Sequence, residues 1–326
     1  MLINKFIMSH SSNKSSADIQ HIQEVVKRIF PQGPAKVERV TEGVSTYVYQ
    51  IIFPHETFYL RVLPEEGASF SPEVTVHTQL RHMQVKVAEV IYFEHYNELL
   101  QRSVMVTTEI KGQSMSQSST LSQEEMEGVL REAGRDLACL NTVRVEGFGW
   151  VRRDSPETRH LRAEWPAHRT FALEYWEADM AYLGKHVLQH SEVALLERVL
   201  SLYDSWLDSE QGYLAHGDFD TTQIYQENGS YTGIIDFGEI RGADRWYDLG
   251  YFHMRDGQLL PFHLLPALVY GYREQVSLPS AYERHIRFTG LLINVRALAH
   301  NLQKRPPNLS TQHQLDLLRE DLVALL

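Results

Sequence analysis

The chain has 326 residues, of which 43% are hydrophobic and 22% charged, as in ordinary globular proteins rather than disordered or fibrous ones. Acidic residues number 42 and basic residues 31, a formal net charge of -11. This excess disfavours a nucleic-acid partner and favours cationic or metal-bound ligands, although solubility alone would also explain it. At this length a single core stops growing, so we expect two lobes with the working site in the cleft between them.

The location of the protein is indicated by its N-terminal residues and its cysteine content. Residues 1–8 are too short and too interrupted for a secretory core, and no apolar run reaches the ~20 residues of a membrane helix. Cys139 is the only cysteine, so it cannot form an intramolecular disulfide. We expect a cytoplasmic protein with no membrane partner.

Residues 18–108 predict a small lobe built mainly from strands, after a loose polar tail over residues 1–17. Asp18 would cap the first helix, and Pro72 would begin the second. The pattern predicts helices over 18–30 and 71–81 and strands over 44–53, 57–62, 87–94 and 104–110. We expect an antiparallel sheet with one helix on it, ending at a lobe boundary near Thr108–Gly112.

Residues 109–326 predict a second lobe that is mostly helical, most strongly over 121–140. The exception is 213–237, where short apolar runs flank Asn228-Gly229, a dipeptide typical of tight hairpin turns. The expected fold class is therefore α+β.

The hairpin also carries the residues best suited to chemistry. Asp218 follows a short apolar strand, Gln223 stands five positions on, and Asp236 ends the next apolar strand. Phosphoryl transfer needs one carboxylate to orient the attacking hydroxyl and oxygen ligands for Mg²⁺. The order and spacing of these three residues favour a role in phosphoryl transfer. The alternative is that the two acids simply belong to turns, since Asp is common where strands end.

These segments resemble the aminoglycoside phosphotransferase-like family of small-molecule kinases, which share the two-lobed protein-kinase fold. His216-Gly217-Asp218 with Gln223 is similar to the family's catalytic segment, and Asp236 matches its later metal ligand. The resemblance implies that Asp218 is the base, that Asp236 and Gln223 bind Mg²⁺, and that Asp248 is a buried structural acid. It further implies ATP or GTP as the donor and a small hydroxylated acceptor.

The same resemblance implies a nucleotide site in the smaller lobe. Ser45 and Thr46 match the family's phosphate-covering turn, where small residues let backbone N–H groups approach the phosphates. Arg61 matches the strand cation that holds the phosphates, and Glu73 matches its helix partner. Glu109 and Ile110, at the lobe boundary, complete the expected nucleotide site.

Two positions depart from the family pattern. Gln223 stands where Asn is usual, and its extra methylene shifts the amide oxygen by about a bond length, which octahedral Mg²⁺ geometry tolerates poorly. Arg61 stands where Lys is commoner, but a guanidinium also grips phosphate oxygens. The first departure bears on rate or metal preference.

The acceptor is expected to contact residues 164–182, which mix aromatics with acids at helical spacing. One interpretation is an amphipathic helix that packs Phe171, Tyr175 and Trp176 into the lobe. The functional interpretation has Glu174, Glu177 and Asp179 grip a cationic acceptor such as an aminoglycoside or an amino alcohol, which would make the chain an antibiotic-resistance kinase. The family resemblance implies an acceptor pocket in this region.

Other functions stay open at this stage. Gln223 and Arg61 are also compatible with a nucleotide-binding module that transfers nothing, and relatives of the family phosphorylate neutral acceptors such as macrolides. A metal-dependent hydrolase would need a second cluster of carboxylates and His, which the sequence lacks. No Gly-x-x-x-x-Gly-Lys-Ser/Thr loop is present, which disfavours the P-loop class of nucleotide site.

Overall fold

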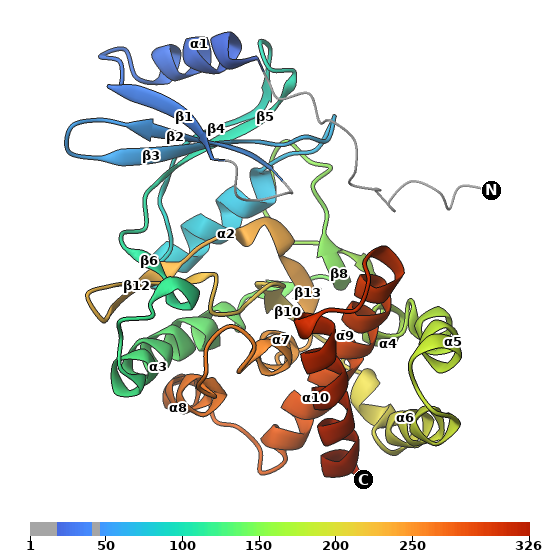
Figure 1. Cartoon of the computed structure of the whole chain (residues 1–326). Helices are drawn as coiled ribbons and strands as arrows, with labels where there is room; N and C mark the ends of the chain where they lie inside the picture. The colour runs from blue at the N-terminus through green and yellow to red at the C-terminus, as the bar shows by residue number, and fades with distance from the viewer. Residues whose placement is uncertain (1–17, 41–45) are drawn as a thin grey trace.

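Alternating apolar residues in the first third of the chain form a five-stranded antiparallel sheet, in the order β1-β2-β3-β5-β4 (Figure 1). This computed structural model describes residues 18–40 and 46–326. Apolar side chains that point to one face of the sheet, among them Tyr49 and Leu60, are fully buried. The strands are β1 (Lys36–Val40), β2 (Tyr47–Ile52), β3 (Thr57–Val62), β4 (Val90–Asn97) and β5 (Arg102–Thr108).

Two helices flank this sheet, α1 (Ile19–Ile29) and α2 (Ser71–His82). Asp18 caps α1 as predicted, because its side chain accepts a hydrogen bond from Gln20 N at 2.9 Å. The apolar stripe of α1 packs Ile22 and Val26 against the sheet. Helix α2 lies between the sheet and the rest of the molecule, so its residues can contact both lobes (Figure 1).

The sequence analysis missed β1 and misplaced β4. Strand β1 carries charges at three of five positions and lies at the sheet edge, which weakens the apolar alternation that identifies strands. The strand predicted over 87–94 instead runs over Val90–Asn97. Val87 makes a parallel bridge with Ile234 and thereby connects the smaller lobe to the hairpin of the larger lobe.

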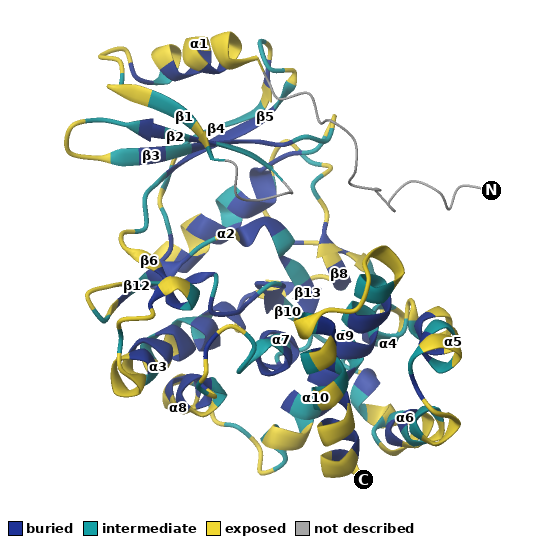
Figure 2. Ribbon diagram, viewed as in Figure 1, coloured by how far each residue is buried: buried dark blue, intermediate teal, exposed yellow. Residues whose placement is uncertain are grey.

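The larger lobe is mainly helical, as predicted. Helix α7 lies at its centre, where seven of its nine residues are buried (Figure 2). In the described ranges, 18–40 and 46–326, no helix is both long and apolar enough to cross a membrane. The helices are α3 (Gln123–Leu140), α4 (His168–Ala172), α5 (Trp176–His186), α6 (His190–Leu202), α7 (Tyr247–Arg255), α8 (Leu265–Gln275), α9 (Tyr282–Lys304) and α10 (Leu309–Leu325).

The predicted hairpin is present as β11 (Ile224–Glu227) and β12 (Ser230–Ile234), and β6 (Gln113–Ser114) pairs with its outer edge. Asn228 and Gly229 form its turn with φ of 52° and 77°, a conformation that this dipeptide tolerates. A second, five-stranded sheet was not predicted, because strands of two to four residues carry little pattern. Its strands are β7 (Arg144–Val145), β8 (Phe148–Val151), β9 (Ala163–Trp165), β10 (Gly212–Ala215) and β13 (Arg241–Ala243).

Residues 164–182 do not form the single amphipathic helix that one interpretation of the sequence expected. The segment begins in β9 and then forms α4 and α5, with a break between Ala172 and Trp176. Tyr175 lies in that break with 40% of its surface exposed, so the prediction that it packs into the lobe was wrong. Its ring is covered by the Arg296 guanidinium, 3.8 Å from the ring centroid.

Candidate active site

The loop that carries Asp218 is held by a buried carboxylate on α7. Asp248 is fully buried and accepts hydrogen bonds from the backbone N–H of His216 and of Gly217, both at 2.9 Å. The Asn141 amide donates to the same carboxylate at 3.0 Å. Charge-assisted bonds to backbone N–H groups are among the stronger ones in proteins. Asp248 therefore fixes the backbone immediately before Asp218.

Gly217 allows this loop to approach the segment after Asp236. Its φ of +90° is strained for other residues, and a Cβ there would lie 2.0 Å from the carbonyl oxygen of Glu239. The two acid-bearing segments, which are about 20 residues apart in sequence, thus lie in backbone contact.

The Asp218 carboxylate has a donor on each oxygen. Tyr251 of α7 donates its hydroxyl hydrogen to Oδ1, and Gln223 Nε2 donates to Oδ2 at 3.2 Å. Burial raises the pKa of Asp218, and the Tyr251 hydrogen bond opposes that rise. The structure thus brings Asp218 and Gln223 together, and it adds Tyr251, which the sequence analysis did not identify.

Asp236 follows β12 in a left-handed backbone conformation, with φ 60° and ψ 70°. Its carboxylate accepts the Gly238 backbone N–H at 3.3 Å, which stabilises the short turn over Phe237–Glu239. Its side chain is 43% exposed. The left-handed conformation is tolerated by Asp and turns the residue out of the strand direction.

A chain of charges connects the smaller lobe to this turn. Arg61 Nη1 lies 2.6 Å from Glu73 Oε2, and Arg61 Nη2 lies 3.4 Å from Asp236 Oδ1. Glu73 is fully buried, so its charge requires partners. The predicted strand cation and its helix partner are therefore in contact, and the cation lies next to the predicted metal ligand.

A second arginine, Arg153, joins this chain of charges. Its Nη2 lies 2.7 Å from the other Glu73 oxygen and donates to the Gly238 carbonyl oxygen at 2.7 Å. Arg153 was not predicted, because it follows β8 and is 80 residues from Glu73 in sequence. The only feature of the sequence that could have indicated Arg153 is the pair of adjacent arginines, Arg152-Arg153, in a chain rich in acidic residues.

The other predicted nucleotide residues are partly described. Ser45 lies outside the described residues, and Thr46 is half-buried just before β2. Glu109 and Ile110 are half-buried and follow β5. Ile110 lies beside Gly233 of the hairpin, where a Cβ would be 3.2 Å from Ile110 Cδ1. The segment between the lobes therefore contacts the strand that leads to Asp236.

The three acids predicted to bind the acceptor have different surroundings. Asp179 is buried and pairs with Arg296 Nη1 at 2.9 Å, so its charge is used inside the lobe. Glu174 and Glu177 are exposed. Glu164, which was not predicted, lies near Glu174, and its pKa is raised by burial and then by that neighbouring charge.

Asp236 and Gln223 offer oxygen atoms, the kind of ligand that a magnesium ion prefers. Asp236 supplies an accessible carboxylate, and Gln223 supplies an amide oxygen, since its nitrogen donates to Asp218. Among the described residues there is no group of three or more His, Cys, Asp or Glu that could hold a metal by itself. Mg²⁺ commonly takes one or two protein carboxylates, with substrate phosphates and water as the other ligands.

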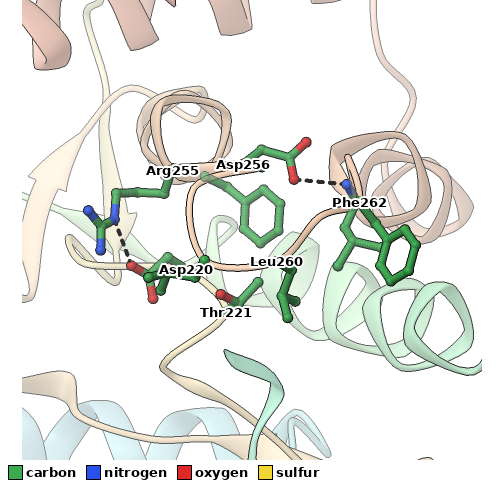
Figure 3. A pocket seen from close by; sticks show the side chains of 10 residues that line it. Asp220, Thr221, Arg255, Asp256, Leu260 and Phe262 are labelled. Carbon is green, nitrogen blue, oxygen red and sulfur yellow. Dashed lines mark hydrogen bonds and ion pairs between the residues drawn. The ribbon is translucent and has the colours of Figure 1, made fainter. Parts of the chain in front are cut away.

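Two hollows in the described surface lie apart from these acids. One is lined by Asp220, Thr221 and the loop after α7, where Arg255 Nε pairs with Asp220 at 3.0 Å (Figure 3). The other, about 730 Å³, is bordered by α2 and by residues 142–146 and 159–161. Neither is lined by Asp218 or Asp236.

Comparison with known proteins agrees with this geometry. The sequence profile of the phosphotransferase enzyme family matches residues 36–285, which is most of the chain and includes both lobes. The chain belongs to this family. The phosphotransferase family match spans Arg61, Glu73, Asp218 and Asp236, so the residues brought together in the structure lie inside the matched region.

Individual members of the phosphotransferase family are distant in sequence. An aminoglycoside 3'-phosphotransferase of Enterococcus faecalis is 21% identical over 239 residues, which cover 69% of this chain and 83% of that protein. A thermostable mutant of aminoglycoside phosphotransferase APH(4)-Ia, solved with AMP-PNP and hygromycin B, superposes with a TM-score of 0.65 at 15% identity. That match covers 93% of this chain and 98% of the other.

A further solved structure, the GDP complex of an aminoglycoside 2'-phosphotransferase-IIIa mutant, gives a TM-score of 0.61 at 17% identity. It covers 94% of this chain and 97% of the other. These structural matches establish the two-lobed kinase-like fold that the sequence predicted.

Proposed function

We propose that the protein transfers the γ-phosphoryl group of ATP or GTP, as its Mg²⁺ complex, to a hydroxyl of a small cationic molecule. The observation that carries the proposal is the meeting of Asp218, Gln223, Asp236 and Arg61 from three separated segments around one backbone contact. Phosphoryl transfer depends on positioning and on charge stabilisation, and these residues supply both.

Asp218 acts as the base. Its carboxylate accepts a hydrogen bond from the hydroxyl group of the small molecule and orients the hydroxyl oxygen towards the γ-phosphorus. It takes the hydroxyl proton as the new P–O bond forms. The leaving nucleoside diphosphate departs as the bond to its β-phosphate oxygen breaks. Burial raises the pKa of Asp218, which makes its carboxylate a better proton acceptor.

Arg61 binds the nucleotide phosphates from the sheet side. Glu73 and Asp236 hold its two terminal nitrogens, which limits the loss of side-chain entropy on binding. Asp236 and the Gln223 amide oxygen would hold Mg²⁺, which when bound neutralises charge on the phosphate oxygens. Thr46, Ser45, Glu109 and Ile110 stay proposals for the remaining contacts with the nucleotide.

The acceptor is proposed to be cationic because acids lie near the base. Glu239 follows Asp236 by three residues, and the charges of Asp218 and Asp236 help to raise its pKa, after burial as the main cause. The charges of Glu164 and Glu174 act on each other, and Glu174 and Glu177 are exposed. Asp179 contributes by fixing Arg296 rather than by direct contact. Acids in a cleft attract ammonium groups.

A panel of matched acceptors tests this function. We would follow transfer of γ-labelled ATP and GTP, with Mg²⁺, to hygromycin B and to the pair glucosamine and glucose, which differ in one ammonium group. The proposal expects phosphorylated product, greater turnover of the cationic compounds, and a loss of that preference as salt screens the acids. Tight nucleotide binding without any product would indicate a binding module instead. Faster, salt-insensitive turnover of glucose would contradict a cationic acceptor.

A further inference from the structure

Tyr251 contacts the base directly, although no local pattern pointed to it. Its hydroxyl donates to Asp218 Oδ1, and its ring packs against Ala215, Ala243 and Tyr247. Both alanines are fully buried, and Tyr251 is half-buried against them. These contacts restrict the movement of the ring.

Tyr251 and Asp248 act on the same loop from the same helix. They are three residues apart on α7, which places them on one face of the helix. Asp248 holds the loop backbone at His216 and Gly217, and Tyr251 holds the side chain of the next residue. One rigid element thus fixes both the position and the orientation of the base.

The Tyr251 hydroxyl stays protonated and so remains a hydrogen-bond donor to Asp218. Burial and the Asp218 charge both raise the pKa of Tyr251, so its hydroxyl keeps its hydrogen throughout the neutral range. Its only hydrogen points to Oδ1, while Gln223 Nε2 occupies Oδ2 at 3.2 Å. Two donors on opposite oxygens define the plane of a carboxylate, which a single donor would leave free to turn.

We propose that Tyr251 is a positioning residue that holds the Asp218 carboxylate in the plane required to accept the hydrogen of the acceptor hydroxyl. The kinetic part of this inference rests on the proposed function, whereas the orientation of Asp218 does not. Loss of the tyrosine hydroxyl should lower turnover while leaving nucleotide binding as it is, because the Tyr251 hydroxyl donates to Asp218, whereas Arg61, Asp236 and Glu73 are bonded to one another and to Arg153.

A double-mutant cycle separates positioning from a general structural effect. Tyr251→Phe should lower kcat roughly tenfold, as expected for a hydrogen bond to a charged group, with the KM for ATP within about twofold of wild type. In an Asp218→Asn background the same substitution should cost almost nothing further, because the group that it positions is gone. Tyr203→Phe is the matched control, since its hydroxyl donates to the Leu325 carbonyl oxygen at 2.9 Å.

Crystal structures of wild type and Tyr251→Phe complete the test. We expect the Asp218 carboxylate to turn or to occupy more than one orientation in the variant. An unchanged carboxylate, or equal losses of kcat in both backgrounds, would overturn the inference. If wild type phosphorylates no acceptor, the proposed function fails, and the orientation of Asp218 in the two crystal structures still decides the role of Tyr251.

Discussion

Arg153 and Arg61 hold opposite oxygens of the Glu73 carboxylate, at 2.7 and 2.6 Å. Arg153 comes from the larger lobe, and its bond to the Gly238 carbonyl oxygen continues the contact to the turn after Asp236. The buried carboxylate of α2 is therefore neutralised from both lobes. This arrangement makes Glu73 a connection between the five-stranded sheet and the turn over Phe237–Glu239.

Arg153→Ala should weaken that connection without leaving Glu73 unpaired, since Arg61 remains. We expect the free energy of unfolding to fall by roughly 1–3 kcal/mol, the range for a lost hydrogen bond to a charged group, and the KM for nucleotide to rise several-fold. Urea unfolding and steady-state kinetics measure the two effects. Arg159→Ala is the matched control, because its partner Glu157 is exposed. Equal behaviour of the two variants would contradict the role given to Arg153.

Asp236→Ala tests the metal ligand. Removing its carboxylate should abolish the dependence of nucleotide affinity on Mg²⁺, while the fold persists because the Asp236 side chain is partly exposed. Titration calorimetry with ATP, with and without Mg²⁺, provides the measurement. A variant that keeps the wild-type Mg²⁺ dependence would show that the metal binds elsewhere.

Asp248→Asn should destabilise the protein by roughly 3 kcal/mol, because the amide keeps only one acceptor oxygen and its NH₂ group would face either the Gly217 N–H or the N–H groups of His216 and Asn141. Urea unfolding measures the change. Asp316→Asn serves as control, since Asp316 is exposed and 3.9 Å from Arg319. A loss as small as that of the control would mean that Asp248 does not hold the loop.

Residues close in sequence were predictable, whereas those brought together by the fold were not. Asp218 and Gln223 could be identified because they stand five positions apart between two short apolar runs. Tyr251 and Arg153 reach the site from 33 and 80 residues away, after Asp218 and Glu73 respectively. Their positions depend on how α7 and β8 pack, and neither residue type is unusual in its local segment.

The errors in secondary structure have a related cause. Strand β1 is a charged edge strand that pairs with β2, and the strands of the second sheet are held by pairing with distant segments, such as Leu214 with Gly242, rather than by their own alternation. Helices α2 and α3 were predicted closely, because helical periodicity and the proline at the start of α2, Pro72, are local features. The fold class followed from these longer elements.

The burial of His77 leads us to predict that the protein loses stability in acid. His77 is buried, donates from Nδ1 to the Ala88 carbonyl oxygen at 2.8 Å, and stacks edge-on against Phe237. Burial lowers the pKa of His77 to about 4, so below about pH 6.5 the unfolded chain binds a proton that the folded chain refuses. Stability should therefore fall by about 3 kcal/mol from this residue as pH drops from 7 to 4.

Denaturant unfolding of wild type and His77→Asn between pH 4 and 7 isolates this contribution. The variant keeps a short polar group for the Ala88 carbonyl oxygen but cannot titrate, so its stability should depend less on pH. The same pH dependence in both proteins would assign the acid sensitivity to other groups.

The most direct test of the account is a single-turnover measurement on Asp218→Asn. With γ-labelled ATP, Mg²⁺ and the best cationic acceptor of the panel, the rate of phosphoryl transfer should fall by about 10² or more, the usual contribution of a positioned base. The Kd for Mg²⁺-ATP, measured by calorimetry on the same sample, should stay within about twofold of wild type, since Asp218 is not proposed to hold the metal. Transfer at the wild-type rate by a folded Asp218→Asn protein would contradict the central claim that Asp218 is the base.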